Sequence, residues 1–220
     1  MTSVFAHRGA SKAEPENTVA AFLRAKAMGA DGVELDVRRH QSGTLAVQHD
    51  VALGTELAPS VPSLAQALDA CAGMTVNIEI KNMPGDPDFD VDETLAARVV
   101  DLLRERGGRD DVIISSFNLS CVNRVRQLDE ALATGFLVVI APDDDVAGRV
   151  VDRCRRHGHT ALNPHHAGVT AHLVELCSAA GLAVNAWTVD DPARMRALRD
   201  LGVASIITNL PDVARTVLGT

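Results

Sequence analysis

The sequence predicts an α/β fold, and within that class a (β/α)8 barrel of the TIM type that spans residues 1–220 as one domain. Eight short apolar segments follow one another along the chain, and most precede a segment whose apolar residues recur at helical spacing. Strands that alternate with helices favour a parallel sheet. Eight such units in 220 residues, with no linker or low-complexity segment, match a compact barrel.

Each predicted strand is a short run whose side chains alternate between two faces, as in any extended chain. In the run 75–81, Val76 and Ile78 share one face, while Glu79 and Lys81 share the other. The barrel strands are expected over residues 3–7, 33–37, 75–81, 112–115, 134–140, 160–163, 182–187 and 204–208.

The predicted helices begin at residues typical of helix N-termini. Asn17 and Asp92 are the expected caps of two helices, and Ser63 has capping-box spacing to Gln66. The helices are expected to begin near residues 18, 64, 93, 118, 145, 170, 192 and 211.

The composition limits the classes of partner. A formal net charge of −8 argues against non-specific binding to nucleic acid. No apolar run approaches the roughly 20 residues that span a bilayer, and the N-terminus lacks a signal-peptide pattern. The four cysteines are scattered without a C-x-x-C pair, as expected in a reducing compartment. We therefore expect a cytoplasmic protein without a membrane segment, either a monomer or a dimer.

An antiparallel hairpin is expected after the second strand. The run 45–49 follows too soon for a parallel crossover, which needs about a dozen residues. A loop of four residues, 40–43, pairs Glu34 with His49 and Asp36 with Val47. In that register His49 shares a face with both carboxylates.

Polar residues gather where the predicted strands end, and in a barrel these ends meet at one mouth. They are His7, Arg8, Glu34, Asp36, Glu79, Lys81, Asn163, Trp187 and Asn209. The three carboxylates are oxygen ligands of the kind that Ca²⁺ and Mg²⁺ prefer. Alternatively, they pair with Arg8, Arg38 or Lys81 in a structural ion network.

The remaining residues at the mouth suggest acid–base chemistry on an anion. His7 and His49 are candidate general acid and base, because imidazole titrates near neutrality. Arg8 and Lys81 are candidates to bind an anionic group. Trp187 ends an inward strand face, where it forms either an apolar wall for a substrate or part of the core.

These residues lie in a set of motifs that resembles the glycerophosphodiester phosphodiesterase family. The motifs are HRGAS at 7–11, PENT at 15–18, GADGVELDV at 29–37, QHD at 48–50, NIEIK at 77–81, ISSF at 114–117, AWTVD at 186–190 and SIITNLPD at 205–212. The resemblance covers almost the whole chain in order.

The resemblance implies a catalytic barrel that hydrolyses glycerophosphodiesters to glycerol 3-phosphate and an alcohol. It implies a divalent cation, Ca²⁺, Mg²⁺ or Mn²⁺, held by the carboxylates of Glu34, Asp36 and Glu79. His7 and His49 match the family's general base and acid. Residues matching Arg8 and Lys81 lie against the phosphate.

Two departures from the family pattern concern the hairpin and the chain after it. The usual Thr-x-Asp-Gly turn is replaced by His40-Gln41-Ser42-Gly43, and the insertion after His49-Asp50 is short, over residues 51–62. We expect the changed turn to affect turn geometry more than chemistry, and the short insertion to leave a more open mouth.

Three other functions fit parts of the pattern. One is phospholipase D-like or lyase action on lysophospholipids that stops at a cyclic phosphate, which product analysis distinguishes from hydrolysis. Another is metal-dependent enolate or aldolase chemistry, which the two histidines and two cations disfavour. The last is a non-catalytic binding module, which the complete set of catalytic matches disfavours.

Overall fold

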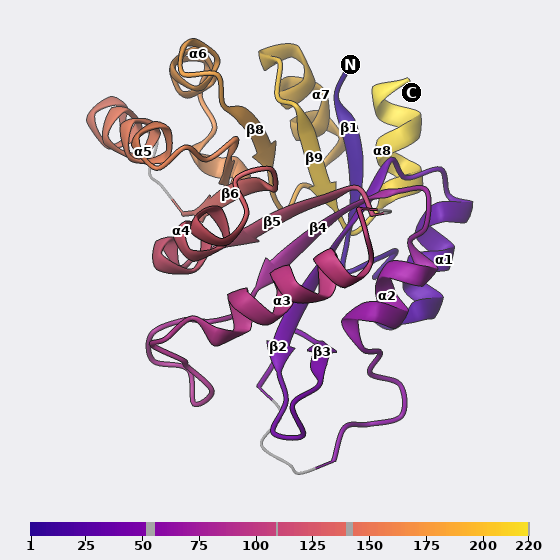
Figure 1. Cartoon of the computed structure of the whole chain (residues 1–220). Helices are drawn as coiled ribbons and strands as arrows, with labels where there is room; N and C mark the ends of the chain where they lie inside the picture. Colours follow the sequence, from indigo (N-terminus) through magenta and orange to yellow (C-terminus); the bar gives the residue numbers. More distant parts are fainter. Residues whose placement is uncertain (52–55, 109, 140–142, 220) are drawn as a thin grey trace.

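A computed structural model describes residues 1–51, 56–108, 110–139 and 143–219. Within these ranges eight parallel strands close into a barrel, because β1 pairs with β9 on one side and with β2 on the other (Figure 1). The barrel strands are β1 (Ser3–His7), β2 (Gly32–Arg39), β4 (Thr75–Ile80), β5 (Val112–Ser116), β6 (Ala133–Val138), β7 (Ala161–Pro164), β8 (Ala183–Ala186) and β9 (Ser205–Thr208). The predicted (β/α)8 barrel is confirmed.

Helices surround the barrel on its outer side (Figure 1). Within the described ranges they are α1 (Val19–Ala27), α2 (Leu64–Ala70), α3 (Thr94–Glu105), α4 (Leu119–Leu128), α5 (Asp144–Arg156), α6 (Ala171–Ala179), α7 (Pro192–Leu201) and α8 (Pro211–Leu218), with a short 3₁₀ turn at His166–Gly168. None of these helices is long and apolar enough to cross a membrane.

The two faces of β2 show how the sequence positions the site. Val33, Leu35 and Val37 are fully buried in an apolar cluster that includes Phe22 of α1 and Leu68 of α2. Burial of such side chains supplies most of the driving force for wrapping helices around the strands. Alternation along the strand therefore directs the polar residues of β2 into the barrel.

Several helices begin where the sequence predicts, but the N-cap residues of two helices differ from the prediction. Ser63 and Gln66 form the predicted capping box of α2. The cap of α1 is Thr18, whose side chain accepts from the amide of Ala21, and not Asn17. Asn17 adopts a positive φ of 56°, and its side chain donates to Asp36 instead. The contact of Asn17 with Asp36 on β2 outweighs the local preference of asparagine for a helix N-cap.

The cap of α3 also differs from the prediction. Glu93, not Asp92, is the N-cap residue, and it makes no side-chain capping bond. The carboxylate of Asp90 accepts from the amide of Thr94 and so satisfies a free donor in the first turn. Asp90 lies four residues before Thr94, and the fold of the intervening loop brings its carboxylate to the start of the helix.

The hairpin exists, but its predicted register is wrong by one residue. Strand β3 (Leu45–Val47) pairs Val47 with Val37, not with Asp36, and leaves five residues, 40–44, in the loop. The amide of His40 donates to the carbonyl of Thr44, and Gly43 has a positive φ of 87°. This wider turn replaces the expected four-residue loop. The pairing of Glu34 with His49 is therefore also wrong, because β3 ends before His49.

Three predicted barrel strands, 75–81, 134–140 and 182–187, extend past the observed ones, and β4 ends at Ile80. The predicted strand 134–140 ends at Val138, and Ile140 lies outside the described residues. Of the short segment expected after His49-Asp50, residues 52–55 also lie outside them. Strand β8 ends at Ala186, and Trp187 continues its direction through a single bridge to His165.

A buried histidine predicts how stability depends on pH. His159 is 5% exposed and lies between Thr134 and Asn123, and burial lowers its pKa from 6.5 to about 4. The fold holds the neutral ring, so its contribution is complete above pH 6.5 and falls as the pH drops towards 4. We expect urea unfolding to show a smaller loss of stability between pH 7.5 and 5 in His159→Gln than in the unsubstituted protein. An equal loss in both proteins would contradict this assignment.

Candidate active site

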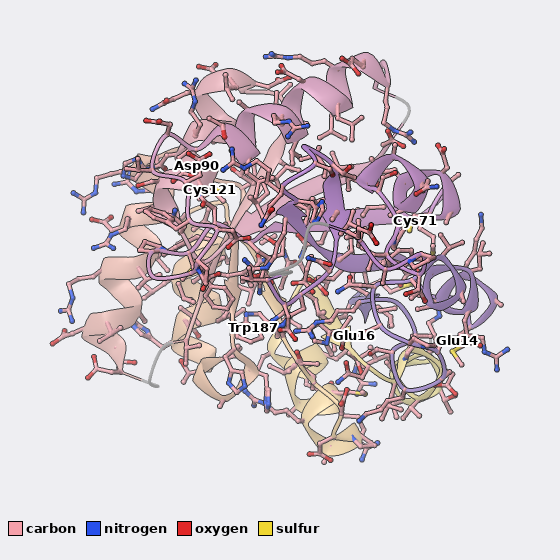
Figure 2. The ribbon with its side chains drawn as sticks, turned by 90° about the horizontal axis from the view of Figure 1, so that it is seen from below. Glu14, Glu16, Cys71, Asp90, Cys121 and Trp187 are labelled. Atoms are coloured by element: carbon pink, nitrogen blue, oxygen red, sulfur yellow. The ribbon has the colours of Figure 1, made fainter. Side chains whose placement is uncertain are left out.

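The strands deliver polar side chains to the end of the barrel that carries the β2–β3 hairpin, opposite the two chain termini (Figure 1). Figure 2 views the molecule from this end, with Trp187 and Glu16 near the middle of the face. Trp187 follows β8 and Glu16 follows β1, so the two ends of the chain contribute to one mouth.

The three predicted carboxylates come together inside the barrel. Asp36 of β2 and Glu79 of β4 are register partners, and Glu34 lies one inward position earlier on β2. One oxygen from each residue lies within 4.8 Å of the others, and all three residues are buried. Oε1 of Glu34 and Oδ1 of Asp36 have no hydrogen-bond partner among the described residues. Oδ1 of Asp36 forms an ion pair with Lys81, so of these two oxygens Oε1 of Glu34 is the one without a charged partner in the described part of the chain. A buried carboxylate oxygen in that position is costly unless a cation meets it.

Their electrostatics favour a bound cation. Burial, and then the charges of Asp36 and Glu79, raise the pKa of Glu34 well above its ordinary value. Burial and the charge of Asp36 likewise raise the pKa of Glu79 to about 7, although Lys81 opposes this. A divalent cation offsets this repulsion, and oxygen-only donors suit Ca²⁺, Mg²⁺ or Mn²⁺. The residues therefore fit a hard metal ion.

Two protein cations already contact the cluster. Nζ of Lys81 lies 2.8 Å from Glu79 and 3.5 Å from Asp36. Nε of Arg8 lies 3.2 Å from Asp36, and its guanidinium also pairs with Glu16. The alternative ion network thus exists in part. Arg38 does not join it, because that guanidinium pairs with Asp86 and Asp88 instead.

His7 is oriented by residues from the far end of the sequence. Its Nδ1 lies 2.7 Å from Oδ1 of Asn209, while its Nε2 lies 3.9 Å from Glu34. The amide nitrogen of Asn209 donates to the carboxylate of Asp190 at 2.7 Å. Burial opposes ionisation of Asp190, but hydrogen bonds from Asn209 and Thr208 outweigh it and lower the pKa of this carboxyl.

This chain of contacts fixes the tautomer of His7. An ionised Asp190 only accepts, so it requires the NH₂ group of Asn209, and the amide oxygen then faces His7. Nδ1 of His7 must carry the proton, and Nε2 is left as a free base. Burial lowers the pKa of His7 although the hydrogen bond that its ring donates to Asn209 opposes this, and the lowered pKa favours the neutral form. The sequence predicted that Asn209 lies at a strand end, but it gave no signal that this residue contacts His7.

His49 lies at the edge of the mouth rather than in the expected strand. The amide of Gln48 donates to the carbonyl of Asp36, which places this segment beside the carboxylate-bearing part of β2. Nδ1 of His49 lies 2.8 Å from Asp50, and 36% of its side chain is exposed. The backbone carbonyl of His49 accepts from Nε of Arg38 at 2.7 Å.

Trp187 lines a small cavity in the barrel mouth together with His7, Glu34, Asn77, Glu79, Leu137 and Ile207. Its indole nitrogen donates to the carbonyl of Asn163, and its ring meets Phe117 edge to face at 5.3 Å. These contacts fix the ring as a wall beside the carboxylate cluster.

The sequence was compared with models of known protein families, and one family matches. The profile of the glycerophosphoryl diester phosphodiesterase family matches residues 7–58 and 52–213. The chain belongs to this family of phosphoric diester hydrolases. A glycerophosphodiester phosphodiesterase of Caldanaerobacter subterraneus subsp. tengcongensis is 30% identical, over 96% of this chain and 95% of that protein.

Solved structures of family members share the fold. A phosphodiesterase of Oleispira antarctica, solved with its product sn-glycerol-3-phosphate, superposes with a TM-score of 0.86 at 24% identity, covering 100% of this chain and 98% of that one. A putative glycerophosphoryl diester phosphodiesterase of Silicibacter pomeroyi also gives 0.86 at 24% identity, over 99% of this chain and 93% of that one.

The Asn209 contact predicts a spectroscopic signature. We expect ¹⁵N chemical shifts of the His7 ring to show a protonated Nδ1 and an unprotonated Nε2 at neutral pH, because Asn209 presents an acceptor to Nδ1. Asn209→Leu removes that acceptor and should raise the share of the Nε2–H tautomer, which is intrinsically the more stable in free imidazole side chains. A His7 signal that is unchanged in a folded Asn209→Leu variant would refute the assignment.

Proposed function

We propose that residues 1–220 form one catalytic domain that hydrolyses glycerophosphodiesters to glycerol 3-phosphate and an alcohol with the help of a divalent cation. The observation that carries this proposal is the trio of buried carboxylates beside a histidine whose Nε2 is free. The product held by the Oleispira antarctica relative supports the choice of substrate class.

Glu34, Asp36 and Glu79 would hold the cation, which is Ca²⁺, Mg²⁺ or Mn²⁺. When bound, it supplies positive charge that stabilises the charge developing on the phosphoryl oxygens. Lys81 and Arg8 already lie against these carboxylates and would contact the substrate phosphate as a point charge and a planar donor.

The two histidines would move the protons. The free Nε2 of His7 takes the proton of the attacking hydroxyl as its oxygen bonds to phosphorus. His49 donates a proton to the leaving alcohol as its bond to phosphorus breaks. If the attacking group is the neighbouring glycerol hydroxyl, the first product is a cyclic phosphate that water opens. Trp187 would form the apolar wall against which the substrate lies.

The expected setting of the enzyme is the cytoplasm. The four cysteines are all free and buried, which fits a reducing compartment. We propose a small-molecule substrate and no nucleic-acid partner, because the net charge of the chain is −8, while Arg8 and Lys81 lie at the mouth, where an anionic substrate would bind.

Metal removal tests the reaction class. We expect release of glycerol 3-phosphate from glycerophosphocholine and glycerophosphoethanolamine in a coupled assay, abolished by EDTA and restored by Ca²⁺, Mg²⁺ or Mn²⁺. Glu79→Gln should weaken metal binding in calorimetry, whereas Glu93→Gln, a buried acid outside the cluster, should leave it unchanged.

Activity that survives chelation would show that the carboxylates are structural. A cyclic phosphate as the final product, or activity confined to lysophospholipids, would favour the lyase or phospholipase D-like reaction. Metal binding without any phosphodiester cleavage would favour enolate chemistry.

Substitution of the histidines tests the proton transfers. His7→Ala and His49→Ala should each lower kcat by about 10²–10⁴-fold if they act as base and acid. His172, which is exposed on α6, provides a control, and His172→Ala should retain full activity. Losses below about tenfold in both mouth variants would rule out this assignment.

A further inference from the structure

Arg38 is a buried cation that the proposed chemistry does not use. It lies near the carboxyl end of β2, and its side chain is 7% exposed. Its guanidinium donates to both oxygens of Asp88, at 2.8 and 3.0 Å, and to Asp86 at 3.0 Å. Its third nitrogen, Nε, donates to the backbone carbonyl of His49 at 2.7 Å.

The loop that carries Asp86 and Asp88 is itself anchored. It follows β4, where the side chain of Asn82 bonds to both the amide and the carbonyl of Asp90. The buried carboxylate of Glu93 accepts from Asn82 at 2.7 Å and from Asn118 of the neighbouring unit at 2.9 Å. Figure 2 shows Asp90 away from Trp187, on another part of the same face. Arg38 therefore connects the His49 segment to a loop with several fixed points.

His49 needs such a connection because the sheet does not hold it. Strand β3 ends at Val47, and the last ladder-like bond in this direction is from the amide of Gln48 to Asp36. The side chain of His49 contacts only Asp50 among the described hydrogen bonds, and Asp50 is exposed. The bond from Arg38 fixes the backbone one residue beyond the end of the ladder.

Resting on the proposed function, we propose that Arg38 is a positioning residue that holds His49 at the distance the proton transfer requires. The guanidinium fork explains the residue type. Nη1 donates to both oxygens of Asp88, Nη2 donates to Asp86, and Nε donates to the carbonyl of His49. A lysine ammonium has a single nitrogen and cannot hold these three partners in this planar arrangement. A catalytic group displaced by about 1 Å loses on the order of 10²-fold in rate.

The test is a double-mutant cycle between Arg38→Lys and His49→Ala. Arg38→Lys alone should lower kcat by about tenfold to a hundredfold with KM changed less than about twofold. In the His49→Ala background it should cause no further loss, because the group that it positions is gone. A kcat equal to that of the unsubstituted enzyme, or an equal loss in both backgrounds, would overturn the proposal.

Arg106 supplies a matched control. Its side chain is also 7% exposed and pairs with two aspartates, Asp69 and Asp110, but it follows the last residue of α3 at the opposite end of the barrel. Arg106→Lys should resemble Arg38→Lys in its effect on melting temperature and leave kcat unchanged. Asp88→Asn provides a milder version of the change in case Arg38→Lys does not fold. A smaller loss of kcat is expected from it, because Asp86 and the carbonyl of His49 still bind the guanidinium.

A measurement without turnover separates this inference from the proposed function. The ring signal of His49 in ¹H–¹³C NMR spectra should shift or broaden in Arg38→Lys and remain in place in Arg106→Lys. If the unsubstituted protein hydrolyses no phosphodiester but the ring signal responds in this way, the proposed function fails and the positioning role stands. An unaltered His49 signal in folded Arg38→Lys would overturn the positioning role, whatever the activity.

Discussion

The mouth of this barrel is organised by the repulsion between three carboxylates buried on two adjacent strands. Glu34, Asp36 and Glu79 face inward because the apolar residues that alternate with them are required by the surrounding helices. Burial then raises the pKa of Glu34 and Glu79, so each nearby positive group stabilises the ionised cluster. Such a site is stable only with cations around it, and this is the property that a phosphodiesterase uses when it binds an anionic substrate.

Closure of the barrel also orients His7, the base of the proposed reaction. The contact between His7 and Asn209 joins the first strand to the segment after the last one, 202 positions apart in sequence. Asp190 sets the amide of Asn209, and that amide sets the tautomer of His7. The orientation of His7, and with it the role proposed for this residue as a base, therefore depends on residues that meet the first strand only after all the strands have assembled.

The segment that carries His49, at the end of the hairpin, is held in a different way from the barrel strands. Its ladder ends before His49, and the buried guanidinium of Arg38 continues the fixation by joining the His49 carbonyl to an anchored loop. The rigid strands thus carry the carboxylates, while a hydrogen-bond network carries the second histidine. This division fits the roles proposed for these residues, because the ligands of a metal must lie close together, whereas a base and an acid that serve the attacking and the leaving group must lie apart.

The sequence alone determined the alternation of strands and helices, and with it the barrel, because the periods of two and 3.6 residues are local properties of the chain. It also determined that Glu34, Asp36 and Glu79 share the inner face, since alternation and parallel pairing are enough to place them together. It did not determine the hairpin register, where hydrogen bonds within the loop added one residue. Only the tertiary structure decided that Asn17 serves Asp36 rather than a helix end, and that Asn209 orients His7. Such contacts join segments distant in sequence, and no local pattern encodes which partners ring closure brings within hydrogen-bonding distance.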